Sequence, residues 1–273
     1  METSTHAPTH ALSRGSVPLL VSFPHAGTGI PPDIEARMTP EALLRADTDW
    51  HLPLLYDFVA QMGASTLVPQ MSRYVIDLNR PPEDTNLYPG QDTTGLVPQD
   101  TFHKQPLYRD GQAPGADEVA ARRERFWQPY HDTLRGELER LRDLHGGAVL
   151  WDAHSISSVL PRFFDGKLPD LNLGTGKGIS CDPSLAQTLL GIAESATGYT
   201  GVLNGRFTGG YITRNYGNPA QNVHAVQLEM TQSSYMQEKL PFDYLPEVAA
   251  GVQPHVRRMI EAVLAFVEGR AKG

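Results

Sequence analysis

The chain has 273 residues, of which 40% are hydrophobic and 20% charged, and this composition suits one or two compact domains with a substantial buried core. It carries 23 Lys and Arg against 31 Asp and Glu, a net charge of −8, and no basic stripe, which argues against nucleic acid as a partner. The single cysteine, Cys181, excludes an internal disulfide and a thiolate cluster, so a bound metal would need His and carboxylate ligands.

The first 16 residues are expected to form a flexible segment ahead of one domain that covers residues 17–273. This segment, "METSTHAPTHALSRGS", lacks the apolar middle region of a signal peptide. No apolar run in the chain approaches the roughly 18 residues that span a bilayer. We therefore expect a cytoplasmic protein with no membrane partner.

The first half of the chain is predicted to contain two strand regions, one helix and one long loop. "VPLLVSF" (17–23) is an apolar run typical of a buried strand that feeds a loop. Residues 40–62 have helical spacing, interrupted near Pro53, and residues 65–80 contain two β-branched segments. The stretch 80–100 is dense in Pro, Gly and Asp, and a loop of that length in a compact domain is usually functional.

The second half of the chain alternates predicted helices with predicted strands. Two strands are expected at 148–155 and 224–232, and three helices at 116–145, 182–198 and 245–270, the last interrupted at Pro254. Strands that alternate with long helical segments favour an α/β fold with a mainly parallel or mixed central sheet and helices on both faces.

Three apolar segments each end in a charged or metal-capable group. His25 follows the first strand, Asp77, Asn79 and Arg80 follow a strand predicted over 74–76, and His154 lies near the end of "AVLWDAHS". Ligands of open α/β sheets bind beyond the carboxyl ends of the strands, so these side chains can converge. Each one alone is a weak signal, because a lone histidine after a strand is more often an ordinary hydrogen-bonded residue.

Acidic residues lie near the same strand ends. Asp152 precedes His154 by two positions in an extended segment, so it shares its face and could orient the imidazole. Asp47 and Asp49 could supply a carboxylate ligand or cap a local turn. Glu229 lies inside the apolar "VQLEMTQ", where an acid costs free energy unless it is paired or used, and burial raises its pKa toward that of a general base. For Glu229 the structural and functional interpretations have about equal weight.

Four arginines surround the predicted strand ends. Arg73 and Arg80 flank the segment "SRYVIDLNR", and Arg206 and Arg214 flank a Gly-Gly turn. A guanidinium matches a carboxylate in a bidentate geometry, so a dicarboxylate substrate would use such groups. Single arginines more often form surface salt bridges.

Long blocks of the sequence resemble the N-formylglutamate amidohydrolase family, the deformylases of histidine degradation. The resemblance rests on these blocks, in order from about residue 17 to 240: "LLVSFPHAGTGIP", "DTDWHLPLLYDF", "SRYVIDLNRPPEDTNLYPGQDTTGL", "WDAHSI", "FDGKLPDLNLGT" and "NGRFTGGYITRNYG…HAVQLEM". The family is similar in fold to zinc carboxypeptidases and aspartoacylases. The resemblance therefore implies a Zn²⁺ ion held by two histidines and an acid, a glutamate base, and an Asn-Arg pair for a substrate carboxylate.

Transferred to this sequence, the resemblance makes His25 and His154 metal ligands and Glu229 the general base, with the carboxylate clamp formed by Asn79 and Arg80. One position departs from the carboxypeptidase-type pattern His-x-x-Glu, because Thr28 stands where the acidic ligand would be. We therefore expect the missing carboxylate to come from Asp49, with Asp47 as the second choice.

The reaction that the resemblance implies is the hydrolysis of N-formyl-L-glutamate to formate and L-glutamate, with one Zn²⁺ per chain. Cobalt or manganese would suit the same ligands. Arg80 is expected to hold one substrate carboxylate, and Arg73, Arg206 or Arg214 the other. Two alternatives stay open: a related amidohydrolase for another N-acyl amino acid, and a non-enzymatic dicarboxylate-binding protein.

Overall fold

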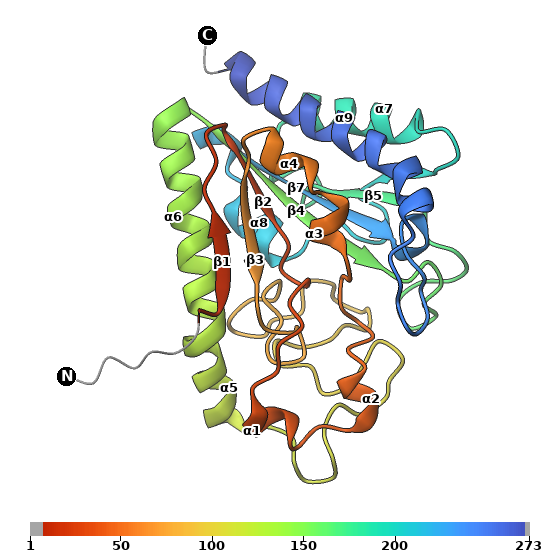
Figure 1. Ribbon diagram of the computed structural model, residues 1–273. Coiled ribbons are helices and arrows are strands. Elements are labelled where there is room, and N and C mark those ends of the chain that lie inside the picture. The colour runs from red at the N-terminus through yellow and green to blue at the C-terminus, as the bar shows by residue number, and fades with distance from the viewer. Residues whose placement is uncertain (1–7, 271–273) are drawn as a thin grey trace, which may run out of the picture.

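The computed structural model describes residues 8–270, whose strands form a seven-stranded mixed sheet (Figure 1). The strands are β1 (His10–Ser13), β2 (Leu19–Ser22), β3 (Ser65–Pro69), β4 (Ala148–Ile156), β5 (Leu171–Gly174), β6 (Gly201–Leu203) and β7 (Val223–Thr231). Their spatial order is β1-β3-β2-β4-β7-β5-β6. The four strands β3, β2, β4 and β7 run parallel, whereas β1 is antiparallel to β3 and β5 is antiparallel to β7. The predicted α/β class with a mixed sheet is confirmed.

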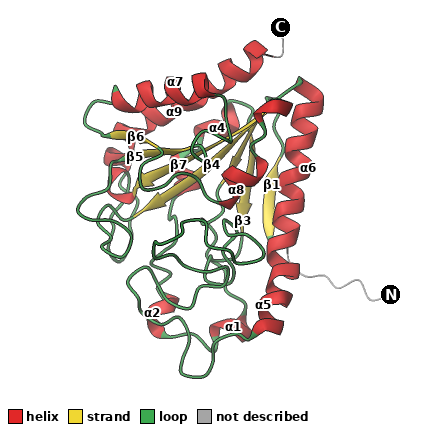
Figure 2. Ribbon diagram, turned by 180° about the vertical axis from the view of Figure 1, so that it is seen from behind, coloured by secondary structure: helices red, strands yellow, loops and turns green. Residues whose placement is uncertain are grey.

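Helices cover both faces of the sheet (Figures 1 and 2). The helices are α1 (Pro32–Glu35), α2 (Pro40–Leu43), α3 (Leu52–Leu55), α4 (Phe58–Gln61), α5 (Ala116–Arg122), the π-helical η1 (Arg123–Trp127), α6 (Gln128–His145), α7 (Pro183–Glu194), α8 (Tyr211–Tyr216), η2 (Pro219–Gln221), η3 (Gln232–Ser234) and α9 (Pro246–Arg270). On one face lie α6 and α8, and on the other α3, α4, α7 and α9. None of the helices in residues 8–270 is both long and apolar enough to cross a membrane.

Alternation along the central strands decides which side chains enter which half of the core. In β4, Val149 and Trp151 pack on the side of α3, α7 and α9, whereas Ala148 and Leu150 pack on the side of α6. Each large apolar side chain buried in this way stabilises the fold by roughly 1.5–3 kcal/mol. Continuing the alternation, His154 falls on the same face as Leu150, at the carboxyl end of the strand. The core pattern therefore fixes the face on which the polar residues of β4 appear.

The prediction of a strand over residues 74–76 is wrong. This segment forms a turn, in which the backbone N–H of Val75 donates to the carbonyl of Ser72. All three side chains of the turn are buried in the core cluster beside α6. Residues 74–76 are apolar because the turn is buried beneath the long loop. A short apolar run looks the same in the sequence whether it is buried as a turn or as a strand.

The helix predicted over residues 40–62 is present only as the single turns α2, α3 and α4. Arg45 and His51 both adopt left-handed backbone conformations, with φ of 52° and 59°, and such residues end a right-handed helix. By contrast, α9 runs through Pro254 without the predicted interruption. An apolar stripe on both sides of that proline, including Val252 and Val256, is buried and holds the helix together.

The other predicted elements are confirmed, and several short ones are additional. The strands expected at 17–23, 148–155 and 224–232 and the helices expected at 116–145 and 182–198 are present, the former helix containing the π-helical turn η1. Part of the segment expected to be flexible is instead the edge strand β1, which pairs with β3, while residues 1–7 lie outside the described residues. The elements β5, β6 and α8 are too short to give a periodic signal.

Candidate functional site

Parallel strand pairing brings the polar residues of β4 and β7 side by side. In register, Asp152 is the neighbour of Gln227, and His154 is the neighbour of Glu229. Paired residues of adjacent strands point to the same face, so all four side chains lie on the face of α6 and α8. His25 follows the carboxyl end of β2, the strand on the other side of β4. These residues meet at the carboxyl ends of three parallel strands, and His25, His154, Gln227 and Glu229 line one cavity there.

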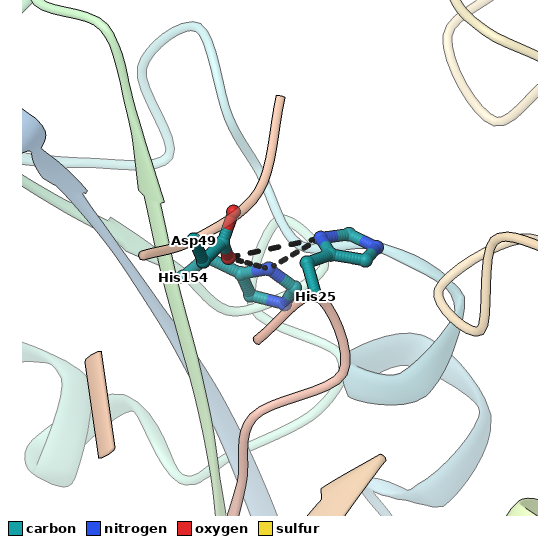
Figure 3. Close-up of side chains that lie close together, drawn as sticks. All are labelled: His25, Asp49 and His154. Atoms are coloured by element: carbon teal, nitrogen blue, oxygen red, sulfur yellow. Dashed lines mark hydrogen bonds and ion pairs between the residues drawn. The ribbon is translucent and has the colours of Figure 1, made fainter. Parts of the chain in front are cut away.

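The side chains of His25, Asp49 and His154 converge on one point and could hold a metal ion (Figure 3). The two Nδ1 atoms are 3.1 Å apart, and Asp49 Oδ2 lies 3.4 Å from Nδ1 of His154 and 3.8 Å from Nδ1 of His25. Nitrogen and oxygen ligands about 2.05 Å from a tetrahedral zinc are about 3.3 Å from one another. The observed separations therefore match the spacing of a three-ligand metal site.

Asp49 has a local environment that fits a metal ligand. Its side chain is 1% exposed, and its Oδ1 atom has no hydrogen-bond partner among residues 8–270. An unpartnered buried carboxylate oxygen costs free energy unless a cation compensates it. Asp49 is held in place because its backbone N–H donates to the carbonyl of His25. Asp47, the second choice, lies outside the group, and its carboxylate accepts a hydrogen bond from the backbone N–H of Phe102.

Carboxylates on the far side of both histidines direct their Nδ1 atoms toward the same point. Nε2 of His25 is 2.7 Å from Asp77 Oδ1, and Nε2 of His154 is 3.1 Å from Asp152 Oδ2. An Nε2–H that donates to a carboxylate leaves Nδ1 as the ring atom with the lone pair, which can bind a cation and which at His25 faces the Nη1 donor of Arg73. The contact between Asp152 and His154 was expected from their spacing in the strand. Asp77 was not expected to have such a role.

Electrostatics differ between the two histidines: burial and the Arg73 guanidinium lower the pKa of His25, whereas the surroundings of His154 favour positive charge. Burial alone would lower the pKa of His154, but the carboxylates of Asp152 and Asp49 hold it well above its usual value. Burial alone would raise the pKa of Asp77, but His25 and Arg73 hold it well below its usual value. The group therefore attracts either a proton or a metal cation, and the carboxylate behind His25 is ionised.

Asp77→Asn is expected to weaken metal binding by about 10–100-fold without unfolding the protein. The substitution keeps the shape but removes the charge behind His25 and the ion pair to Arg73, whose Nη2 lies 2.7 Å from Asp77 Oδ2. The measurement is a zinc titration of the apo protein against a competing chelator. Asp170→Asn is the matched control, because Asp170 is also buried but pairs with Thr200 and Lys167. Zinc affinity equal to that of the wild type would contradict the role given to Asp77.

The three candidate metal ligands His25, Asp49 and His154 are called the metal-type group below. Glu229 lies beside this group but is not one of its members. Its side chain lines the cavity, is nearly buried, and accepts a hydrogen bond from Nε2 of Gln227 at 3.2 Å. Burial raises the pKa of Glu229 to about 8, against the opposing effect of the His154 charge. A carboxyl group with a pKa near neutrality, next to a cation site, has the properties of a general base.

The structure brings three of the four predicted arginines to the cavity. Arg73, Arg80 and Arg206 line it, whereas Arg214 does not. Arg214 instead donates hydrogen bonds to the carbonyls of Gly209 and Leu87. Its guanidinium therefore holds two loops together and is not aimed at the cavity.

The three arginines differ in how much of the guanidinium is already used. Arg73 is 5% exposed, pairs with Asp77, and donates from Nη1 to Nδ1 of His25 at 3.2 Å. Arg80 donates from Nε to the carbonyl of Thr94 at 2.8 Å. Arg206 has no ion pair with an acidic side chain in the described part of the chain. Arg80 has no such ion pair either, but it donates three hydrogen bonds, whereas Arg206 donates one, from Nε to the carbonyl of Phe163. Arg206 therefore has more N–H groups available to a ligand than Arg80.

Three aromatic rings, called the aromatic wall below, surround Arg206 and were not predicted from the sequence. The centroids of the Phe207, Tyr88 and Phe163 rings lie 5.1, 5.4 and 5.9 Å from its guanidinium carbon. Tyr88 belongs to the long loop predicted to be functional, and that loop also contributes Asp92 to the cavity lining. Phe163 and Phe207 carry no sequence signal, because only tertiary structure brings them together.

The chain is similar to known proteins over nearly its whole length. The family model described as N-formylglutamate amidohydrolase matches residues 17–236. The chain is 52% identical to N-formylglutamate deformylases of Pseudomonas putida and Pseudomonas aeruginosa, over 93% and 94% of this chain and 94% and 96% of theirs. The solved structure of an N-formylglutamate amidohydrolase from Ralstonia eutropha superposes with a TM-score of 0.79 at 25% identity, covering 95% of this chain and 97% of that one. A protein of Agrobacterium tumefaciens has the same fold, with a TM-score of 0.70 at 18% identity over 95% and 96% of the two chains.

Proposed function

The chain belongs to the N-formylglutamate amidohydrolase family, and on that basis we propose that it hydrolyses N-formyl-L-glutamate to formate and L-glutamate. The observation that carries the proposal is a single cavity that combines a metal-type group, a buried carboxyl group and several arginines. A cation site suits amide hydrolysis, and the arginines suit a substrate with two carboxylates. The reaction would be the last step of a histidine degradation route.

We propose that His25, Asp49 and His154 hold one Zn²⁺ ion per chain. Two imidazoles and one carboxylate are ligands that zinc accepts, and three protein ligands leave a fourth position open. The unpartnered oxygen of Asp49 and the facing Nδ1 atoms support this assignment. When bound, the ion lowers the pKa of water toward neutrality and polarises the formyl carbonyl. Cobalt or manganese would suit the same donors.

Glu229 carries the protons in the proposed reaction. Its carboxylate takes a proton from the attacking water as the hydroxide oxygen forms a bond to the formyl carbon. It then returns the proton to the nitrogen of glutamate as the carbon–nitrogen bond breaks, which releases formate and the amino acid. The guanidinium of Arg73, beside His25, stabilises the negative charge that develops on the formyl oxygen.

Arg80 and Arg206 hold the two substrate carboxylates in this proposal. Asn79 supports the first of them, because it precedes Arg80 and lines the same cavity. The aromatic wall confines the guanidinium of Arg206 and shields it from water, which strengthens its attraction for an anion. Arg214 is left out of the clamp because its hydrogen bonds are all to neighbouring loops.

Arg80→Lys and Arg206→Lys are each expected to raise KM for N-formyl-L-glutamate by about 10–100-fold, because an ammonium cannot replace a bidentate fork. The measurement is steady-state kinetics of formate release, with metal content as a check. Arg214→Lys is the matched control and should leave KM unchanged. A wild-type KM in Arg80→Lys or in Arg206→Lys would show that the substituted arginine does not bind a substrate carboxylate.

The proposed function is tested by a formate-release assay on apo protein and on zinc-reconstituted protein. N-formyl-L-glutamate is compared with N-acetyl-L-glutamate and with N-formyl-L-glutamine, which lacks the side-chain carboxylate. We expect zinc-dependent turnover that is fastest with N-formyl-L-glutamate. Preference for the acetyl compound would identify a different N-acyl amino acid hydrolase. Binding of N-formyl-L-glutamate without turnover would identify a dicarboxylate-binding protein.

A further inference from the structure

Gln227 occupies a position that neither metal binding nor the substrate clamp explains. It precedes Glu229 by two residues in β7, so both side chains project from the same face of the strand. The side chain lines the cavity although the residue is only 3% exposed. A buried amide is costly unless its hydrogen bonds are satisfied, so its partners indicate its role.

The orientation of the Gln227 amide is fixed by the backbone. The N–H of Gly210 donates to Oε1 of Gln227 at 2.8 Å. Because a backbone N–H can only donate, the end of the amide that faces Gly210 must be the oxygen. The NH₂ end therefore faces Glu229, and Nε2 donates to Glu229 Oε2 at 3.2 Å.

This contact is the single side-chain hydrogen bond to the Glu229 carboxylate within residues 8–270. We propose that Gln227 is a positioning residue that aims the Glu229 carboxylate at the attacking water. The proposal rests on the function given to Glu229 above. A glutamate side chain has several rotatable bonds, and a misplacement of about 1 Å at a reacting group costs on the order of 10²-fold in rate.

The backbone that orients Gln227 also holds the substrate side of the cavity. A Cβ atom on Gly210 would lie 2.4 Å from Nδ2 of Asn79, so only glycine allows this approach. Two residues later, the N–H of Ile212 donates to Oδ1 of Asn79 at 2.8 Å. The backbone at the start of α8 therefore contacts both Gln227 and Asn79 and fixes the distance between them. Through Gln227 it also affects the position of Glu229 relative to the proposed carboxylate clamp.

Two variants test the role of Gln227 in the zinc-reconstituted enzyme. Gln227→Met removes the donor to Glu229 with little change of volume, and we expect kcat to fall by about 10–100-fold with KM changed less than about twofold. Gln227→Glu keeps an oxygen for Gly210 but sets a carboxyl group against Glu229, and should lower kcat at least as much. Zinc content and melting temperature are measured for both variants. Gln253→Met is the matched control, because Gln253 also donates from Nε2 to a carboxylate, that of Asp57, but lies outside the cavity.

A double-mutant cycle separates positioning from a structural role. In the Glu229→Gln background no base remains to be aimed, so adding Gln227→Met should cause no further loss of the residual kcat. An equal further loss in that background would show that Gln227 acts only through structure, and would overturn the proposal. A wild-type kcat in Gln227→Met, with Glu229→Gln inactive, would also overturn it while leaving the proposed function intact. A wild-type kcat in Glu229→Gln would instead remove the proposed function of Glu229, and the positioning role with it.

Discussion

Glu229→Gln is expected to lower kcat for N-formyl-L-glutamate by about 10²–10⁴-fold while the protein keeps its fold and its metal. Glutamine has nearly the same shape as glutamate but cannot accept the proton of the attacking water. The carboxyl group lies beside the metal-type group and is not one of its three members, so metal content should not change.

Three measurements on the Glu229→Gln variant separate the roles that its position allows. A fall in kcat at full zinc content and unchanged melting temperature supports a proton-transfer role. A loss of zinc together with a fall in kcat would show that Glu229 is a metal ligand. A lower melting temperature, with normal activity of the folded fraction, would show that Glu229 has a structural role. A wild-type kcat would contradict the proposed mechanism.

Removing any member of the group His25, Asp49 and His154 is expected to abolish tight zinc binding and with it the activity. A three-ligand site that loses one donor also loses the geometry that selects the ion. The variants His25→Ala, Asp49→Ala and His154→Ala are compared with wild type by metal analysis after dialysis against a weak chelator. We expect about one zinc per chain in the wild type and much less than one in each variant.

The matched control for Asp49→Ala is Asp47→Asn. Asp47 is buried only two positions away, but its carboxylate is engaged by the backbone N–H of Phe102. This variant should keep its zinc, because asparagine still offers an oxygen to that N–H. Full zinc occupancy in Asp49→Ala, or its loss in Asp47→Asn, would reverse the choice between the two aspartates.

Much of the site could be predicted because strands have a strict period of two. His154 and Glu229 lie in long apolar strands, and the alternation of buried residues determines the face on which each appears. The β4–β7 pairing, which no single segment encodes, then makes them neighbours. The contact of Asp152 with His154 was expected because the two residues are two positions apart in one strand. The same rule applied to β7 would have placed Gln227 beside Glu229.

The contacts of residues on loops could not be predicted from the sequence, although Asp49 was the preferred carboxylate. The choice of Asp49 over Asp47 depends on a backbone hydrogen bond to His25, and the position of Arg214 depends on loops that it joins by its own hydrogen bonds. Asp77 was visible only as a polar residue after a strand, and that strand is a turn. In each case the deciding contact joins segments whose relative positions are fixed only in the folded chain.

The dependence of the site on strand register has a consequence for the folding of this protein. A slip of one residue between β4 and β7 would turn Gln227 and Glu229 to the opposite face, away from His154. The pairing of β2 with β4 joins Ser22 to Asp152, 130 positions apart in the chain, and such distant contacts form slowly. During refolding, hydrolytic activity should therefore return in a single late phase together with the complete central sheet, and partly folded chains should have none.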